Sequence, residues 1–227
     1  SEAALEMKLN LSTESNKFLL LLLSTDIIFI SLHVIFTHTP YVGNPYFLIT
    51  EDRGYAEAFQ YIKEYWLMIL FLILAVQKRS LLYFGWSLFF GFLLMDDSFQ
   101  IHERAGTKIR RNFDFSPMFG LRTQDLGELI VFAIVGTFFL VYIGFAYYFS
   151  QNDLKEICRR LLVLLIALVL FAVVIDAVHT MARSLSENAI LNTVFQIVED
   201  GGEMVVMSII AWFVLSLTGR ERRLRNS

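Results

Sequence analysis

The chain has 227 residues, of which 56% are hydrophobic and 18% are charged, and its formal net charge at pH 7 is −3. Soluble domains are about 45–50% apolar and about 25% charged, so this composition is typical of a polytopic membrane protein and excludes a disordered chain. The slightly acidic balance offers no basic surface for nucleic acid. The single cysteine, Cys158, excludes an intrachain disulfide and a zinc site built from cysteines.

Six apolar runs are each long enough to cross a hydrocarbon core about 30 Å thick, which needs roughly 20 helical residues. They lie near residues 18–36, 58–76, 81–102, 126–149, 161–181 and 190–217. The second run is the weakest, because Lys63 and Glu64 interrupt it. The runs do not alternate polar and apolar residues, as the strands of a membrane barrel must. The sequence therefore predicts an all-α fold, a single transmembrane helical bundle over residues 1–227, surrounded by a lipid bilayer.

Lysine and arginine residues indicate the orientation of such a bundle. Six spans place both termini on one side, and that side carries eleven of the nineteen Lys and Arg residues. We therefore expect both termini in the cytoplasm. We also expect no cleaved secretory signal peptide, because no A-x-A-like cleavage site follows the first apolar run.

Acidic and histidine side chains recur in the predicted spans, although a charge at the centre of a span costs about 2.5–3.5 kcal/mol on insertion scales. With a helical rise of about 1.5 Å per residue, these side chains fall in one layer about 18–27 Å above the inner boundary. Spacings of three, four or seven residues also put several of them on shared helix faces. The sets that share a face are Asp176 with His179, Glu199 with Glu203, and Asp96 with Gln100 and Glu103.

Carboxylates gathered in one low-dielectric layer repel one another unless protons or bound cations neutralise them. Oxygen ligands with one or two imidazoles suit Fe, Mn, Zn or Ca, and Asp176 with His179 repeats the acid-x-x-His pair of di-iron bundles. The sequence therefore predicts a site for one divalent metal ion, or for two, in the outer half of the bundle. The predicted ligands are Asp96, His102, Glu103, Asp176, His179, Glu199 and Glu203. Five further candidates are Asp97, Glu128, Asp200, His33 and Glu64.

Single members of this set also have structural interpretations. Asp97 can pair with Arg104, and His33 can be a hydrogen-bonded packing residue. Asp26 lies deeper, and we expect it to bond to Ser24 or to a neighbouring helix. The set as a whole has no such explanation, because too many acids lie at one level.

Two segments carry a resemblance to other proteins. The third predicted span reads L-M-D-D-S-F-Q-I-H-E, and the sixth contains V-E-D-G-G-E-M. Together they resemble a group of little-characterised bacterial multi-pass membrane proteins, whose pattern is an acidic pair, four residues and His-Glu on one helix, then Glu-acid-x-x-Glu on a later helix. The matching residues are Asp96, Asp97, His102, Glu103, Glu199, Asp200 and Glu203. The resemblance covers two of six helices and implies a protein of the bacterial inner membrane, but no known reaction.

Three functions stay open. The first is a metal-dependent enzyme that activates water or dioxygen and acts on a lipid-like or periplasmic substrate. The second is a transporter or channel for a cation or proton, which needs a path that the apolar inner halves of the spans do not offer. The third is a non-catalytic subunit of a larger membrane complex. Assembly of the chain as a homo-oligomer is also compatible with the sequence. Whether the protein is an enzyme is therefore undecided by its sequence.

Overall fold

The computed structural model describes residues 2–112, 123–185 and 188–224, and the regular structure within them is helical. Four passes are α1 (Glu2–His38), α2 (Tyr55–Lys78), α3 (Leu81–Phe99) and α5 (Thr123–Tyr148). The fifth pass joins α6 (Asn152–Val169), the π-helical segment η2 (Leu170–Ile175) and α7 (Asp176–Leu185), and the sixth is α8 (Ala189–Leu224). Two short helices, η1 (Pro45–Phe47) and α4 (Ile101–Asn112), lie between passes.

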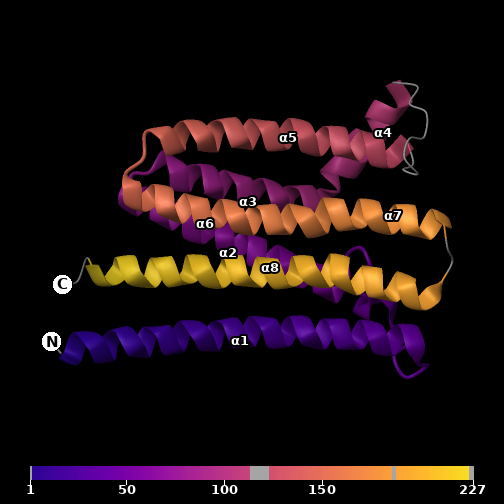
Figure 1. Ribbon diagram of the computed structural model, residues 1–227, viewed down its shortest axis with the longest axis horizontal. Coiled ribbons are helices and arrows are strands. Elements are labelled where there is room, and N and C mark those ends of the chain that lie inside the picture. Colours follow the sequence, from indigo (N-terminus) through magenta and orange to yellow (C-terminus); the bar gives the residue numbers. More distant parts are fainter. Residues whose placement is uncertain (1, 113–122, 186–187, 225–227) are drawn as a thin grey trace.

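The helices form an antiparallel bundle that the chain crosses six times, with both termini at one end and α4 at the other (Figure 1). Five helices in the described ranges are long and apolar enough to cross a membrane. The remaining pass through the bundle is the third, α3, whose 19 residues rise about 28 Å. This is close to the hydrocarbon thickness of about 30 Å. The predicted all-α helical bundle of about six spans is confirmed.

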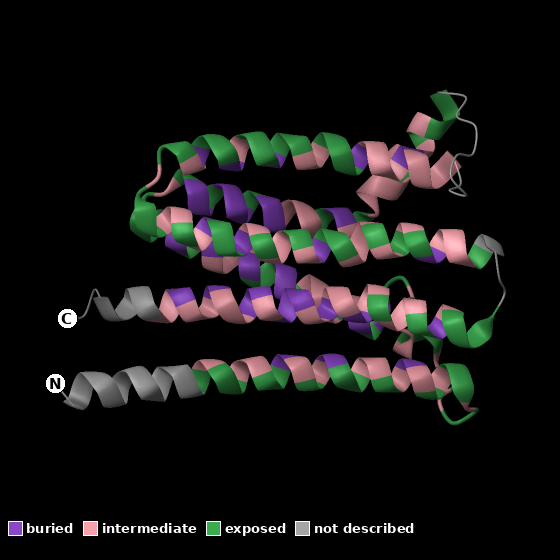
Figure 2. Ribbon diagram, in the orientation of Figure 1, coloured by how far each residue is buried: buried purple, intermediate pink, exposed green. Residues whose placement is uncertain are grey.

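The core lies around α8, which packs against α1, α2, α6, η2 and α7. Figure 2 shows buried residues concentrated on α8 and on the inner faces of α2 and α3, whereas α5 is largely exposed. Phe71, Trp86 and Phe90 are buried and stack on one another, with 5.7 Å between the ring centroids of Phe71 and Phe90. The apolar core therefore fills the half of the bundle that is nearer to the termini.

The third pass ends earlier than its sequence predicts. Helix α3 stops at Phe99, because Gln100 adopts a left-handed conformation with φ 51° and donates its backbone N–H to the Asp96 carbonyl. A side-chain oxygen of Asp96 then accepts the backbone N–H of His102 at 2.8 Å, in the first turn of α4. The helix therefore ends three residues before the predicted limit near residue 102. Asp96, Gln100 and Glu103 do not share one face of one helix, since the chain turns between them.

Helix α4 packs onto the start of α5 through two glycines. A Cβ atom added to Gly127 would lie 2.5 Å from the carbonyl oxygen of Gly106, so this close approach requires glycine. Beside it, the Gln124 amide donates to the Glu103 carbonyl at 3.1 Å and accepts from the Thr107 hydroxyl at 3.1 Å. These contacts hold the first turn of α4 against α5.

Candidate functional site

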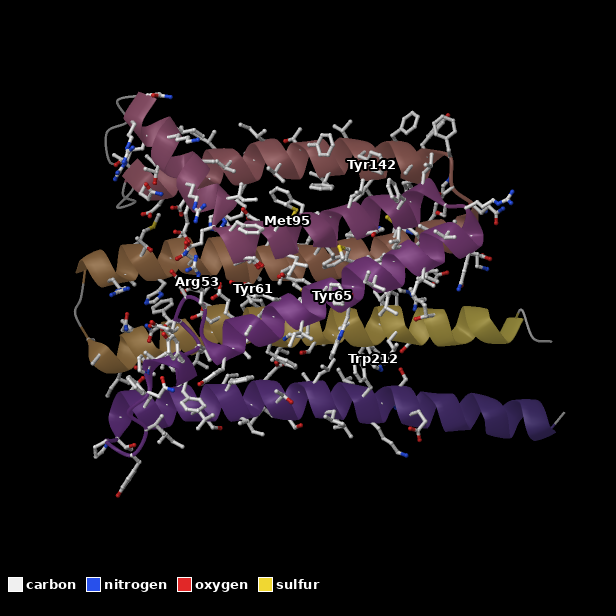
Figure 3. The ribbon with its side chains drawn as sticks, turned by 180° about the vertical axis from the view of Figure 1, so that it is seen from behind. Arg53, Tyr61, Tyr65, Met95, Tyr142 and Trp212 are labelled. Carbon is white, nitrogen blue, oxygen red and sulfur yellow. The ribbon has the colours of Figure 1, made fainter. Side chains whose placement is uncertain are left out.

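A cavity of about 480 Å³ lies in the half of the bundle that is remote from the two termini, beside α4. Figure 3 shows nitrogen and oxygen atoms gathered at this end, near Arg53 and Tyr61. Besides His102, eleven acidic residues line the cavity, and no Lys or Arg is among the described residues that do so. The acids are Glu51, Asp52, Glu57, Glu64, Asp96, Asp97, Glu103, Asp176, Glu199, Asp200 and Glu203.

The cavity brings together most of the residues that the sequence analysis singled out, from α2, α3, α4, α7 and α8. The predicted ligands on its wall are Asp96, His102, Glu103, Asp176, Glu199 and Glu203, with Asp97, Asp200 and Glu64 from the further candidates. Three candidates are not on this wall: His179, Glu128 and His33.

His179 lies behind the cavity wall. One of its ring nitrogens, Nδ1, is 2.7 Å from a carboxyl oxygen of Glu199, and the other, Nε2, is 2.9 Å from the side-chain oxygen of Asn192. Its ring also stacks on Phe195, with centroids 5.3 Å apart. Both ring nitrogens of His179 therefore have partners in this arrangement, and His179 orients Glu199.

Glu128 and His33 have other surroundings. Glu128 accepts a hydrogen bond from the Gln124 amide at 2.6 Å. His33 is 1% exposed, and the Gln196 side chain is the polar group beside it. The structure therefore places His33 in the packed interior.

His102 is the histidine that faces the cavity, and Asp96 holds it there. The distance from Asp96 Oδ2 to His102 Nδ1 is 2.9 Å, and the imidazole lies 4.9 Å from the Phe132 ring between centroids. Because Nδ1 binds the carboxylate, Nε2 is the ring nitrogen left for a ligand in the cavity. A carboxylate behind an imidazole is the arrangement that orients metal-bound histidines.

Burial and neighbouring charges both shift the pKa values of the two titratable residues in the first turn of α4. Burial lowers the pKa of His102, but the hydrogen bond to Asp96 and the nearby carboxylates outweigh it, so the pKa is raised overall. Burial also raises the pKa of Glu103, and the adjacent His102 opposes that shift. The turn thus holds an acid and an imidazole whose protonation depends on what else occupies the cavity.

Glu64 is the most confined acid of α2 on this wall. It is 2% exposed, and its Oε2 atom has no hydrogen-bond partner among the residues that the structure describes. The neighbouring Tyr61 hydroxyl donates to the Asp97 carbonyl at 3.2 Å. A buried carboxyl oxygen without a partner is costly, and a cation or a polar group in the cavity would satisfy it.

The acids of α8 come to the wall because α8 packs closely on η2. Gly202 faces the Phe171 ring, and a Cβ atom at this position would overlap it. The glycine therefore lets the two helices meet. The close contact sets the position of Glu199, Asp200 and Glu203, which line the cavity around it.

A buried charge network lies beside the cavity, at Met204. The sequence predicted that Asp26 bonds to Ser24 or to a neighbouring helix, but it did not identify Lys63 and Ser208 as its partners. The Lys63 ammonium donates to Asp26 Oδ1 at 3.2 Å, to the Met204 carbonyl at 2.9 Å and to the Ser208 hydroxyl at 3.2 Å. The Ser208 hydroxyl donates to Asp26 Oδ2 at 2.6 Å. Asp26 thus bonds to neighbouring helices and not to Ser24. Lys63 was visible in sequence as a charge in a span, but its partners lie 37 and 145 residues away.

Several acids on the wall were also missed by sequence reasoning. Glu57, Gln60 and Glu64 follow one another at intervals of three and four residues on α2, so their shared helix face could have been found. Glu51 and Asp52 lie in the segment before α2, where no helical period applies, and gave no such signal.

The cavity acids spread over its wall. No group of three or more His, Cys, Asp or Glu side chains within the described ranges is placed so that it could hold a metal ion. Any shared ligand must therefore draw these side chains inward by rotation about their side-chain bonds.

A family described as Domain of unknown function (DUF8692) matches residues 20–218. The chain belongs to this family. The match includes part of each of the six passes and every residue on the cavity wall. No curated protein and no solved structure matches the chain. The family description assigns no activity.

Proposed function

We propose that this membrane protein binds one or two divalent metal ions in the acid-lined cavity. The observation that carries the proposal is the wall itself, with eleven acids and His102 but no Lys or Arg among its described residues. Carboxylates that line one cavity in a low-dielectric setting repel one another, and they are stable as protonated acids or beside a positive charge. Fe, Mn, Zn and Ca all accept oxygen ligands with an imidazole.

Two local features support a cation over simple protonation. The Oε2 atom of Glu64 is buried on the wall with no hydrogen-bond partner among the described residues. Asp96 binds Nδ1 of His102 and leaves Nε2 for the cavity. One carboxyl oxygen of Glu64 and one ring nitrogen of His102 are therefore available to a metal ion in the cavity.

The size of the cavity favours an enzyme over a purely structural site. A volume of about 480 Å³ equals roughly sixteen water molecules at about 30 Å³ each. That is far more than one or two ions need. A bound cation could supply Lewis-acid activation of water or of a substrate group. The remaining space would then hold a lipid-like or periplasmic substrate.

Transport is the second candidate. The network of Lys63, Asp26 and Ser208 extends the polar region beyond the cavity, as an ion path would. Beyond it the core is apolar, with Leu67, Phe71 and Trp86 buried to 1% exposure or less. A site open at one end therefore fits the described residues better than a continuous pathway.

We further propose that the protein lies in a bacterial inner membrane with both termini cytoplasmic. The support is that the termini lie at one end and that eleven of nineteen Lys and Arg residues fall on that side. Assembly as a homo-oligomer or within a larger complex stays a prediction, which the mass of the detergent-solubilised protein would test.

The proposal is tested by element-resolved metal analysis of the purified protein and of Glu203→Gln. We expect wild type to carry one or two divalent ions per chain and the variant to lose them, because a neutral amide replaces a charged oxygen ligand. At a free-ion concentration a thousandfold above Kd, a chelator should lower the free energy of unfolding by about 4 kcal/mol. Glu156→Gln is the matched control, since Glu156 is exposed on α6 and pairs with Arg160.

The control should keep the metal content and melting temperature of wild type. A wild-type protein that carries no metal, and whose melting does not change with chelator, would refute the metal site. The cavity would then be a protonated or purely structural polar site.

A further inference from the structure

The acid-lined cavity offers more charge and more room than metal ions alone would use. Two divalent ions bring four positive charges, whereas eleven acids line the wall. The buried Lys63 ammonium pairs with Asp26, which is not on the wall. A volume of about 480 Å³ also falls within the range of roughly 300–1,000 Å³ found for pockets that bind small organic molecules. The cavity can therefore hold an organic cation.

The acids of α2 and of the segment before it lie at increasing depth. Asp52 is exposed, Glu57 is half-buried, and Glu64 is 2% exposed. Glu57 and Glu64 stand seven residues apart on α2, which is about 10 Å along its axis. A cation that enters from the α4 end of the bundle therefore meets successive carboxylates on its way inward.

Three acids from different parts of the chain interact at the outer end of the cavity, which we call the mouth. Burial raises the pKa of Glu103, and the charges of Asp52 and Glu57 raise it further. The Gln100 amide donates to Asp52 at 3.1 Å, and both residues line the cavity. The mouth therefore attracts positive charge.

Two buried oxygen atoms further along α2 have no hydrogen-bond partner among the described residues. They are Oε2 of Glu64 and Oε1 of Gln60, and both side chains line the cavity. Residues four apart lie on one helix face, so the two acceptors are neighbours. An ammonium group carries three N–H donors and no acceptor, so it can satisfy both oxygens.

Apolar side chains lie among the acids of the wall. Leu93 of α3, Leu168 of α6 and Met207 of α8 line the same cavity. The ligands of a metal ion converge on one point, and no group of three within the described ranges does so. Dispersed carboxylates with apolar surface between them match a flexible chain whose positive charges are separated by methylene groups.

We propose that the cavity binds a linear aliphatic polyamine, with one terminal ammonium group at Gln60 and Glu64 and the other at the acids of the mouth. An extended triamine with three- and four-carbon spacers measures roughly 11 Å between its terminal nitrogens, for bonds of about 1.5 Å. This length is close to the axial separation of Glu57 and Glu64. The proposal goes beyond the metal site and does not depend on it, since ammonium groups pair with carboxylates directly.

Isothermal titration calorimetry of the detergent-solubilised protein with spermidine tests the proposal. Butylamine, with one ammonium group, and an uncharged diol of the length of spermidine are the control ligands. The wall variants are Glu64→Gln and Glu57→Gln, and the second serves if the first does not fold. Glu57→Gln keeps an oxygen that can accept the Arg53 backbone N–H. Glu156→Gln is the matched control, since Glu156 is exposed and lies off the wall.

We expect spermidine to bind wild type and Glu156→Gln equally. Butylamine should bind about a hundredfold more weakly, because it makes one charged contact in place of several, and the diol should not bind. Each wall variant should weaken spermidine binding about tenfold, since a neutral amide replaces a carboxylate. Spermidine that binds no more tightly than butylamine, or that binds wild type and both wall variants equally, would overturn the proposal.

Metal content, measured on the same samples, separates this proposal from the metal site. A protein that carries metal but does not bind spermidine would overturn the polyamine proposal alone. Spermidine binding by a protein that carries no metal would support the polyamine and contradict the metal site alone.

Discussion

Lys63 and Glu64 are neighbours in sequence, yet their side chains lie in different parts of the molecule. Successive helical residues point about 100° apart. Lys63 therefore reaches Asp26 between α1 and α8, while Glu64 lies on the cavity wall. Both charges of the Lys63–Asp26 pair are fully buried, at 3.2 Å. Such a pair adds little stability over an apolar pair, but the loss of one partner leaves an uncompensated charge.

We predict that Lys63→Met lowers the free energy of unfolding by about 3–5 kcal/mol, because Asp26 is left buried without its cation. The double variant Lys63→Met/Asp26→Leu should recover most of this loss. Unfolding in detergent micelles, followed by circular dichroism, measures both. Lys17→Met is the control. Its exposed pair with Glu14 should contribute at most about 1 kcal/mol. A double variant as unstable as the single one would contradict the pairing.

At the scale of the elements, α4 decides whether His102 faces the cavity. Its first turn begins where α3 stops at Gln100, and the Gly106–Gly127 contact holds it against α5. Helix α4 is amphipathic and short, so its place depends on this contact more than on its own helix stability. The site therefore depends on a helix that crosses no membrane.

Gly127→Ala should destabilise the protein by about 1–3 kcal/mol, because the added methyl group meets the Gly106 carbonyl at 2.5 Å. It should also weaken metal binding, since His102 and Glu103 move with α4. Gly136→Ala on the same helix is the control, with nothing within 4 Å of the new Cβ atom. It should be neutral or stabilising by up to about 1 kcal/mol. Thermal melting and metal content measure both, and equal effects of the two substitutions would contradict the packing argument.

At the scale of the whole molecule, six passes divide the chain between two membrane faces. The termini and the α5–α6 turn lie at one end, and the segment between α1 and α2 lies at the other with α4 (Figure 1). The cavity is near the α4 end, and the stacked aromatic core occupies the other half. The interior of the bundle is thus polar in the half near α4 and apolar in the half near the termini.

Cysteine labelling in intact cells tests this arrangement. In a Cys158→Ala background, Tyr41→Cys should react with an impermeant maleimide, and Gln151→Cys should react only after lysis. Both positions are exposed, Tyr41 to 87%, whereas Cys158 is buried. The reverse pattern would invert the proposed orientation, and labelling of both from outside would contradict the six-pass topology.

Much of this protein is readable from its sequence, because apolar run length and helical period are local properties. Six apolar runs predicted the bundle, and the rise per residue placed the acids of α2, α3, α7 and α8 at one level. The helical period also places Glu57, Gln60 and Glu64 on one face of α2.

Tertiary structure decided which faces meet and what each side chain contacts. The turn at Gln100 separates His102 from α3, the helix that carries Asp96. The Asp96 carboxylate nevertheless contacts both the backbone N–H and the ring Nδ1 of His102. Packing places His179 beside Glu199 and Asn192. It also places Lys63 beside Asp26, which is 37 residues away in the sequence. No local period encodes such choices, because a buried charge takes whichever partner packing brings within hydrogen-bond reach.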